Sequence, residues 1–349
     1  MQRENSSGVS GRERDLSIDF MRAFCAVGII AFHFFCHTEE HQTRLFYEFA
    51  NGSFGNTIVN MFFLISGAML YYNYPGIKSL KSFYYKRFKS IYPMFYIAFL
   101  AAYFYYSIRV RDFFYGGNPA KLLLTLFGLD GYFLYLAPNY YQVGEWFLGA
   151  IVMLYAIYPV LLKVFNKSAV LATVIAFVLY GTAFLPGLFR VDIACNMFSC
   201  LISFELGMVL MRHRKLWKSN LVIFIVSLIL SLGILFIKME IIHRNIFNHL
   251  LAICLFFVFS YIGGLIMRNG VCLKVFSEIS KLSFAIFLVQ HIIINFMLGR
   301  YMPANDVLSV LWLTATAAVS VGVAKVLTVV NNVLLKSKAF QKIDACFLK

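Results

Sequence analysis

The chain has 349 residues, of which 61% are hydrophobic and only 13% charged, and its mean hydropathy is +0.76. Soluble domains carry about 25% charged residues, so this composition excludes a water-facing globule. The net charge of +15 would suit a nucleic-acid-binding protein. However, the basic residues form short clusters between apolar segments, as in the loops of a membrane protein. We therefore expect an all-α polytopic membrane protein with the lipid bilayer, and no nucleic acid, as its partner.

The cysteines give no sign of disulfide bonds or of a metal site. The chain has seven cysteines, an odd number, and most of them lie inside apolar runs without CxxC spacing. Buried free thiols are the simplest interpretation, so the sequence supports neither a disulfide framework nor a zinc site. We expect no bound metal.

Apolar runs along the chain show where transmembrane helices are expected, since one crossing of the membrane takes ~20 apolar residues. The first run has a basic flank but no convincing signal-peptidase site, so it is expected to be an uncleaved helix. The stretch 119–137 is interrupted by Gly128, Asp130 and Gly131 and predicts a re-entrant or interfacial segment. About ten transmembrane helices are predicted, at 18–37, 56–74, 91–108, 146–163, 169–187, 197–211, 220–237, 246–267, 282–298 and 307–333.

The distribution of basic residues predicts the orientation. With the N-terminus inside, 22 of the 31 Lys and Arg fall in cytoplasmic segments and 8 in outer segments, and Lys325 lies within the last span. Such an excess over short loops favours cytoplasmic N- and C-termini. The predicted domains are a cytoplasmic tail at 1–17, a transmembrane domain at 18–335 and a second cytoplasmic tail at 336–349, in a multi-pass protein of the cell membrane.

The first predicted helix carries the most informative polar residues. Arg22 and His33 are eleven residues apart, which places them within ~20° of one helix face and about 16 Å apart along the axis. Asp19, one turn before Arg22, could hold its guanidinium in place. The structural alternative is a snorkelling arginine with a hydrogen-bonded histidine. In the functional interpretation, a neutral imidazole inside the membrane is a suitable general base.

Two further segments could support a site near the first helix. The segment 83–93, at the end of the first cytoplasmic loop, places Lys86, Arg87 and Lys89 before Pro93 and suits phosphate binding, although topology alone also predicts basic residues there. In 60–67, Ser66 and Gly67 favour close helix packing first and a functional role second.

Four more residues are second-tier candidates. Glu145 and Trp146 open the fourth span at the expected outer interface, where Trp anchors are common and a glutamate can simply be solvated. Glu205 is more deeply embedded and needs a partner or a proton. His291 lies within the predicted span 282–298, beside Gln290, and a lone helical histidine is more often structural than catalytic.

Taken together, these segments resemble the acyltransferase-3 family of membrane O-acyltransferases, which modify bacterial surface glycans and related hydroxyl acceptors. The resemblance runs nearly end to end and rests on Asp19, Arg22 and His33, on MFFLISGAML, on EWFLGAIVMLYAIYP and on ISKLSFAIFLVQH. The family often has two arginines three residues apart, of which Arg87 fills the first position and Ser90 the second. Neighbouring Lys89 is the candidate replacement, although lysine lacks the forked guanidinium.

The resemblance implies that His33 is catalytic and that acyl-CoA is a co-substrate, without a permanently bound cofactor. We therefore expect transfer of an acyl group, acetyl in first place, to a hydroxyl of a cell-envelope carbohydrate or lipid-linked glycan. Arg22, Arg87 and Lys89 would bind the donor. The alternative is a transporter or flippase in which Arg22, His33, Glu205 and His291 bind substrate or relay protons, with a membrane sensor as a weaker third possibility.

Overall fold

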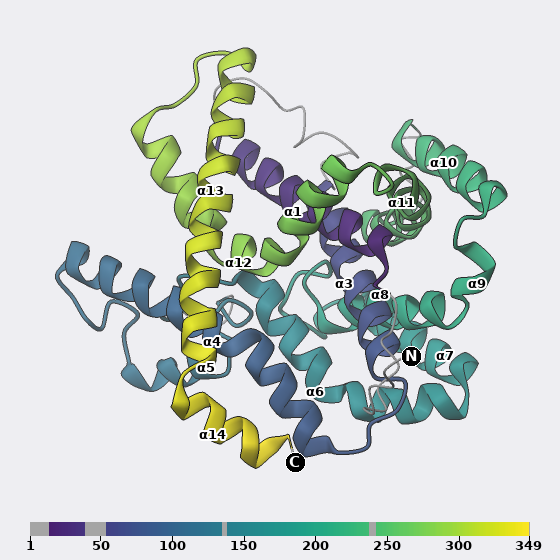
Figure 1. The fold of residues 1–349 in the computed structure, drawn as a ribbon, viewed down its shortest axis with the longest axis horizontal. Coiled ribbons are helices and arrows are strands. Elements are labelled where there is room, and N and C mark those ends of the chain that lie inside the picture. The colour runs from purple at the N-terminus through teal and green to yellow at the C-terminus, as the bar shows by residue number, and fades with distance from the viewer. Residues whose placement is uncertain (1–13, 39–53, 135–137, 237–241, 349) are drawn as a thin grey trace, which may run out of the picture.

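The computed structural model describes residues 14–38, 54–134, 138–236 and 242–348, and within these ranges all regular structure is helical (Figure 1). The helices that carry the site described below are α1, α4, α6 and α12. The elements are α1 Leu16–Cys36, α3 Phe54–Asn73, α4 Leu80–Val110, η1 Pro119–Lys121, α5 Leu122–Leu126, α6 Glu145–Lys167, α7 Ala169–Thr182, α8 Met197–Arg212, α9 Arg214–Trp217, α10 Leu221–Phe236, α11 Arg244–Ile266, α12 Gly270–Arg300, α13 Asp306–Leu335 and α14 Lys338–Phe347.

Every predicted span overlaps one helix, and seven of the described helices are long and apolar enough to cross a membrane. These seven are α1, α3, α4, α6, α11, α12 and α13. The other three predicted spans correspond to α7, α8 and α10, which have 14, 16 and 16 residues. The chain is thus an all-helical, multi-pass membrane protein, while the count of ten and the orientation stay predictions.

Two helices begin earlier than the apolar runs suggest. The basic segment 83–93 was expected in a loop, but it forms the first turns of α4, which starts after the N-cap Ser79. Likewise, α12 starts at Gly270, where Asn269 accepts hydrogen bonds from the backbone of Val271 and Cys272. Side-chain caps of this kind satisfy backbone donors at a helix start, so charged turns can extend a membrane helix into the interfacial region.

Helix α1 occupies the middle of the bundle and packs against α3, α11, α12 and α13 (Figure 1). The most extensive helix pair is α3 with α8. A Cβ atom on Gly67 would lie 1.8 Å from the carbonyl oxygen of Phe204, and one on Gly207 would lie 2.0 Å from that of Leu64. Small residues permit such backbone approach between membrane helices, so the packing role predicted for the Ser66–Gly67 pair is confirmed for Gly67.

The broken segment between α4 and α6 lies against α4. The hydroxyls of Tyr92 and Tyr96 donate to the carbonyls of Phe127 and Leu126, at 2.9 and 2.6 Å. Asp130 is 1% exposed and accepts hydrogen bonds from Thr125 and from the backbone of Gly131. Irregular backbone at membrane depth needs such partners, so these contacts are compatible with the predicted re-entrant or interfacial segment, which stays a prediction. Residues 135–137 of the predicted stretch lie outside the described ranges.

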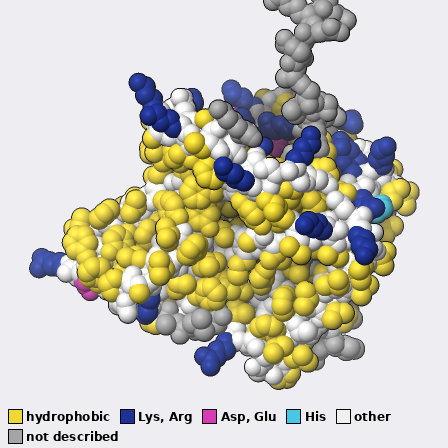
Figure 2. All heavy atoms as spheres, turned by 90° about the horizontal axis from the view of Figure 1, so that it is seen from below, with side chains coloured by type: hydrophobic (Ala, Val, Ile, Leu, Met, Phe, Trp, Pro, Cys, Tyr) yellow, Lys and Arg dark blue, Asp and Glu magenta, His cyan; other side chains and the backbone are white. Residues whose placement is uncertain are grey.

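The outer surface fits a lipid environment. Hydrophobic side chains cover most of the face in Figure 2, and Lys and Arg gather mainly toward its upper part. Many large apolar residues of α7, α10 and α13 are more than half exposed, among them Val170, Val222 and Val333. A soluble protein rarely shows such continuous apolar surface, so these faces are those that contact lipid.

Candidate active site

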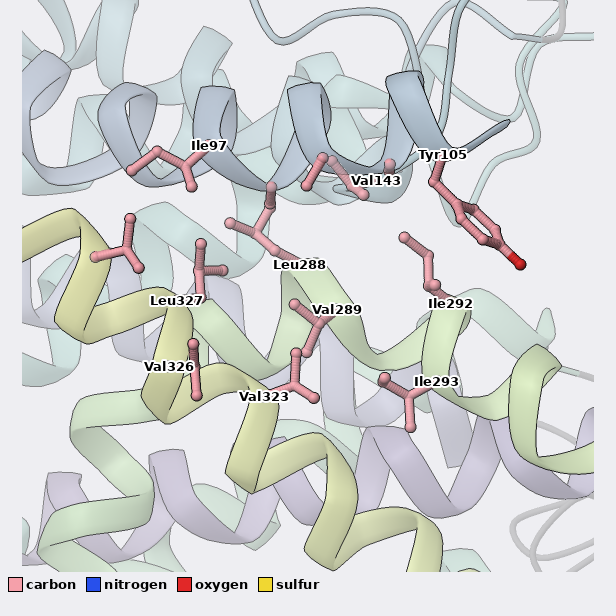
Figure 3. A pocket seen from close by; sticks show the side chains of 14 residues that line it. Ile97, Tyr105, Val143, Leu288, Val289, Ile292, Ile293, Val323, Val326 and Leu327 are labelled. Carbon is pink, nitrogen blue, oxygen red and sulfur yellow. The ribbon is translucent and has the colours of Figure 1, made fainter. Parts of the chain in front are cut away.

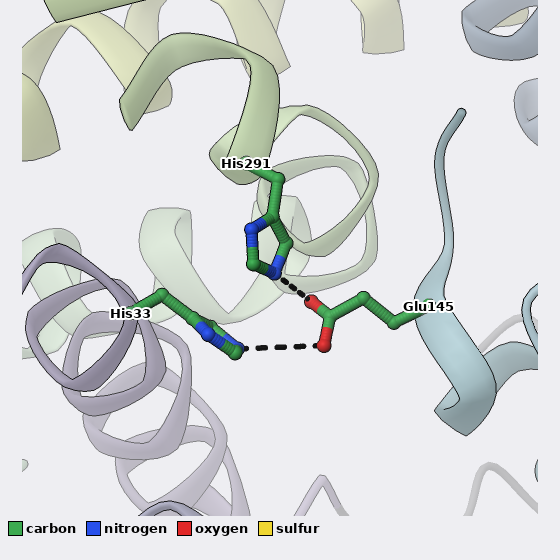
Figure 4. Close-up of side chains that lie close together, drawn as sticks. All are labelled: His33, Glu145 and His291. Carbon is green, nitrogen blue, oxygen red and sulfur yellow. Dashed lines mark ion pairs between the residues drawn. The ribbon is translucent and has the colours of Figure 1, made fainter. Parts of the chain in front are cut away.

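The structure brings three polar residues from separate helices into one cluster. His33 comes from the last turn of α1, Glu145 from the first turn of α6 and His291 from α12 (Figure 4). The Nε2 atom of His33 lies 3.4 Å from Oε2 of Glu145, and Nε2 of His291 lies 2.8 Å from Oε1. The imidazole centroids are 4.1 Å apart. One carboxylate thus bridges two histidines.

A sharp backbone turn presents Glu145 to the histidines. Gly144 has φ +90° and Glu145 itself has φ +40°, a left-handed conformation that is uncommon for a non-glycine residue. A Cβ atom on Gly131 would lie 2.5 Å from the carbonyl oxygen of Glu145, so the broken segment packs directly on this turn. Strained backbone of this kind is frequent at functional sites. Glu145 is therefore a positioned carboxylate and not a solvated residue of the outer interface.

The cluster is enclosed but remains accessible. The side chains of His33 and Glu145 are each 15% exposed, and that of His291 is 27% exposed. Gln290, which is fully buried, donates to Oε1 of Glu145 at 3.2 Å, while its own amide oxygen has no partner among the described residues. Gln290 was not named as a candidate site residue in the sequence analysis. Its position beside His291, as a polar residue in an apolar helix, could have indicated that it belongs to the site.

This constellation can perform acid–base chemistry. The carboxylate can orient an imidazole and stabilise its protonated form, as in hydrolases that use a His–Asp pair. Two imidazoles and a carboxylate are also a known ligand set for catalytic zinc, and the three ligand atoms lie within 4.8 Å of one another. The side chains therefore fit both a general base and a metal centre, and the predicted absence of metal stays a prediction.

A second polar region lies toward the other end of α1. The Arg87 guanidinium donates to the Tyr74 hydroxyl at 3.2 Å and lies over the rings of Tyr74 and Tyr155, while its buried Nε has no partner among the described residues. Arg22 is half-buried on α1 and lies in the neighbourhood of Tyr155. Arg22 and Arg87 are thus grouped around Tyr155, which lies ten residues, or about 15 Å, along α6 from Glu145.

Lys89 points to a different neighbour. Its ammonium group contacts the Asp344 carboxylate of α14 at 2.6 and 2.8 Å, and the Tyr85 hydroxyl donates to the same carboxylate at 2.8 Å. The Tyr85 ring also stacks on Phe347. The pKa of Asp344 lies below its ordinary value, chiefly because Lys89 and Tyr85 donate to it. The predicted C-terminal tail therefore includes a helix that binds the start of α4, and Lys89 is part of that contact.

The remaining candidates lie apart from the cluster or support it. Asp19 pairs with Arg14 and accepts from the Ser280 hydroxyl at 2.9 Å, so its hydrogen bonds go to these residues and not to Arg22. Glu205 is fully buried and accepts from Thr173 on α7 at 2.8 Å. Trp146 packs near Phe63 of α3. Ser66 is half-buried in α3, directly before the tightly packed Gly67.

Another buried histidine forms a separate network. His249 of α11 lies 2.8 Å from the Ser203 hydroxyl and 3.0 Å from the Ser199 hydroxyl, both on α8. All three residues are at most 6% exposed. Interhelical hydrogen bonds of this type hold membrane helices together, so this network is an element of packing between α8 and α11.

Comparison with known proteins identifies the family of this site. A family model described as an acyltransferase domain, Acyl_transf_3, matches residues 15–329 and so includes His33, Glu145 and His291 together with Arg22 and Arg87. No curated protein and no solved structure matches the chain. The matched range covers most of the chain, from the cap of α1 into α13. The chain belongs to the acyltransferase 3 family and is a membrane acyltransferase.

Proposed function

We propose that this acyltransferase moves an acyl group, acetyl in first place, from acyl-CoA to a hydroxyl of a cell-envelope carbohydrate or lipid-linked glycan. The observation that carries the proposal is the bridging of His33 and His291 by Glu145, at the opposite end of α1 and α6 from the Arg22–Arg87 group. One region has acid–base groups and the other has guanidinium groups for an anion. An acyl-CoA needs both, since its nucleotide end is polyanionic and its thioester lies at the end of a long arm.

His33 is the proposed base. Its neutral imidazole accepts the proton of the acceptor hydroxyl while the oxygen attacks the thioester carbonyl. The carbon–sulfur bond then breaks, and the imidazolium returns the proton to the leaving thiolate. Glu145, 3.4 Å from Nε2 of His33, holds the ring orientation and stabilises the imidazolium between the two steps.

The arginine group is the proposed binding site for the donor's phosphates. Guanidinium groups bind phosphate by paired, charge-assisted hydrogen bonds. Arg87 has a buried Nε without a partner in the described structure, so this donor of the guanidinium is not committed to another residue there. The axial separation between Arg22 and His33, about 16 Å, leaves room for the extended arm between phosphate and thioester.

The predicted topology agrees with an acyl donor that binds from the cytoplasm and an acceptor that reacts near the outer surface. With both termini inside, the Arg22–Arg87 end faces the cytoplasm, where acyl-CoA is made, and the His33 cluster lies toward the outer surface. The Lys89–Asp344 contact supports this arrangement, since it joins two segments that were both predicted to be cytoplasmic. Reporter fusions after Lys81, Lys215 and Lys338 should read inside, and those after Ser53, Asp192 and Asn305 should read outside. An outside reading at Lys215 would overturn the helix count in the first half of the chain.

The function is tested with purified protein and labelled acetyl-CoA. The wild-type chain should transfer or hydrolyse the acetyl group, whereas His33→Ala should lose turnover by at least a factor of about 100, the usual contribution of a general base. His33→Ala should still bind acetyl-CoA, because the arginine group is intact. His249→Ala is the matched control, since it removes a buried histidine outside the cluster.

Three results would count against parts of the proposal. Full activity of His33→Ala would make the histidine structural. Joint loss of acetyl-CoA binding and turnover would place His33 in donor binding and not in the chemistry. Loss of wild-type activity on treatment with a chelator, restored by zinc, would replace the general base with a metal centre at the same three side chains.

A further inference from the structure

Gln290 is a buried polar residue of α12 whose side chain makes one hydrogen bond among the described residues, and that bond goes to the candidate active site. The side chain is fully buried, and its amide nitrogen donates to Oε1 of Glu145 at 3.2 Å. The amide oxygen is also buried and has no partner in the described part of the chain. An unpaired buried polar atom is costly, and polar side chains inside membrane helices usually mark function. Gln290 therefore needs an explanation beyond helix packing.

The face of α12 that carries Gln290 and His291 meets the start of α6. An apolar groove between α4, α12 and α13 is lined on the α12 side by Leu288, Val289, Ile292 and Ile293 (Figure 3). At ~100° per residue, Gln290 and His291 lie on the opposite face of the helix from these four residues. One turn earlier, Phe287 packs on Phe147 of α6 with the ring centroids 5.2 Å apart. This ring contact holds the first turn of α6, and with it Glu145, against the polar face of α12.

The two oxygens of Glu145 have different partners (Figure 4). Oε1 accepts from Gln290 and lies 2.8 Å from Nε2 of His291, whereas Oε2 lies 3.4 Å from Nε2 of His33. Two neighbouring residues of α12 thus hold one oxygen, so the carboxylate cannot rotate freely and its second oxygen stays aimed at His33. Because the Gln290 amide is neutral, it fixes Glu145 without neutralising the charge that stabilises an imidazolium.

This division of partners determines which nitrogen of His33 is free to react. An ionised carboxylate only accepts hydrogen bonds, so Nε2 of His33 carries a proton when it pairs with Oε2 of Glu145. A neutral imidazole has one N–H and one acceptor nitrogen. The acceptor nitrogen of His33 is then Nδ1.

We propose that Gln290 is a positioning residue of the acyl transfer: by holding Oε1 of Glu145 it keeps Oε2 on Nε2 of His33, so that Nδ1 of His33 takes the proton of the acceptor hydroxyl. The inference rests on the proposed function, in which His33 is the base, and adds the residue that orients this base and the nitrogen that reacts. The step is balanced, because the proton that Nδ1 takes passes to the thiolate released when the carbon–sulfur bond breaks.

A double-mutant cycle tests whether Gln290 acts through Glu145. Gln290→Met keeps the approximate size of the side chain but removes the donor, so kcat should fall about tenfold, the effect of one lost hydrogen bond to a charged group, with KM for acetyl-CoA unchanged. In the Glu145→Gln background the same substitution should change kcat by less than about twofold, because two residues that act as a unit are not additive.

Asn331→Leu is the matched control. Asn331 is also a buried amide whose oxygen has no partner among the described residues, but it lies on α13, which contributes no residue to the cluster. Its kcat should stay within about twofold of wild type. Thermal unfolding and acetyl-CoA binding of each purified variant show whether the fold and the donor site are intact.

NMR of protein labelled with ¹⁵N-histidine identifies the reacting nitrogen, with His33→Ala assigning the signals of His33. At about pH 8, where an ordinary imidazole is neutral, wild-type His33 should carry its proton on Nε2. Gln290→Met should move part of the population to the tautomer with the proton on Nδ1. The wild-type spectrum tests the inference even where a variant does not fold.

The inference would be overturned by full kcat of Gln290→Met, by an equal loss in Asn331→Leu, or by a tenfold loss that persists in the Glu145→Gln background. A wild-type His33 that carries its proton on Nδ1 would overturn it as well. A wild-type protein that yields no acylated product, whatever the tautomer of His33, would instead refute the proposed function.

Discussion

The two polar regions of the bundle differ in how they are assembled. The His33–Glu145–His291 cluster unites residues more than 100 positions apart in the chain, each from a different helix. The basic start of α4 does the opposite: Arg87 and Lys89 are two residues apart, but one points to Tyr74 and Tyr155 and the other to Asp344. Residues two apart on a helix lie about 200° from each other around its axis. Two residues that are close in sequence, Arg87 and Lys89, therefore have different partners, whereas the three cluster residues, far apart in sequence, meet in space.

The difference changes which substitutions should matter most. In the proposed function, residues of the cluster act on the reacting atoms and Arg87 acts on binding of the donor, whereas Lys89 holds α14 through its contact with Asp344. We therefore expect a graded series of effects, beginning with the carboxylate that bridges the histidines.

Glu145→Gln should have the largest of these effects. The amide keeps the shape of the side chain but removes the charge that stabilises a protonated His33, so kcat should fall about 100-fold, within the range of acid–base contributions, with little change in KM for acyl-CoA. Steady-state kinetics measure this. Glu205→Gln is the matched control, because Glu205 is also a buried membrane glutamate but bonds to Thr173. Equal losses in the two variants would remove Glu145 from the mechanism.

Arg87→Lys should act on donor binding. Lysine keeps the charge but lacks the planar fork that binds phosphate through two hydrogen bonds, so KM for acyl-CoA should rise about tenfold, the loss of one good charge-assisted contact. Lys86→Ala, at an exposed neighbour, should stay near wild type. If Lys86→Ala raised KM as much as Arg87→Lys, general positive charge and not the guanidinium would bind the donor.

Lys89→Ala gives a smaller effect and separates two interpretations of this residue. The sequence predicts that Lys89 replaces a missing arginine, so its loss should raise KM for acyl-CoA. The contact with Asp344 predicts instead that Lys89→Ala and Asp344→Ala loosen α14 to a similar small extent and that the double variant adds nothing. Protease sensitivity of the C-terminal segment, measured beside KM, distinguishes these outcomes.

Asp130 should produce the weakest effect, and one that depends on pH. Burial raises its pKa to about 6 from the ordinary 3.8, so the folded protein binds this proton more tightly than the unfolded chain. Stability from this residue is therefore present below about pH 4 and is lost as the pH rises through 6. Asp130→Asn should flatten the change in unfolding temperature between pH 5 and pH 7. An unaltered pH dependence would show that other groups cause it.

The sequence predicted the helical class, the presence of a helix at each predicted span and the family. Lipid as solvent demands long apolar helices, so composition and run length alone locate them. The spacing of Arg22 and His33 predicts that α1 carries functional residues. The basic turns of α4 and α12 were misplaced into loops, because hydropathy detects the part of a helix inside lipid and not its capped extension at the interface.

The lengths of the helices and the contacts of the polar side chains could be determined only from the tertiary structure. Among the described residues, seven helices meet the length for a membrane crossing. Helices α7, α8 and α10 are shorter, which no boundary drawn from hydropathy could show. Only helix packing decided that Glu145 bridges His33 and His291, that Asp19 accepts from Ser280, and that Lys89 contacts α14. Each of these outcomes depends on which faces of separate helices meet, and a local periodicity specifies the face of one helix but not the neighbour that covers it.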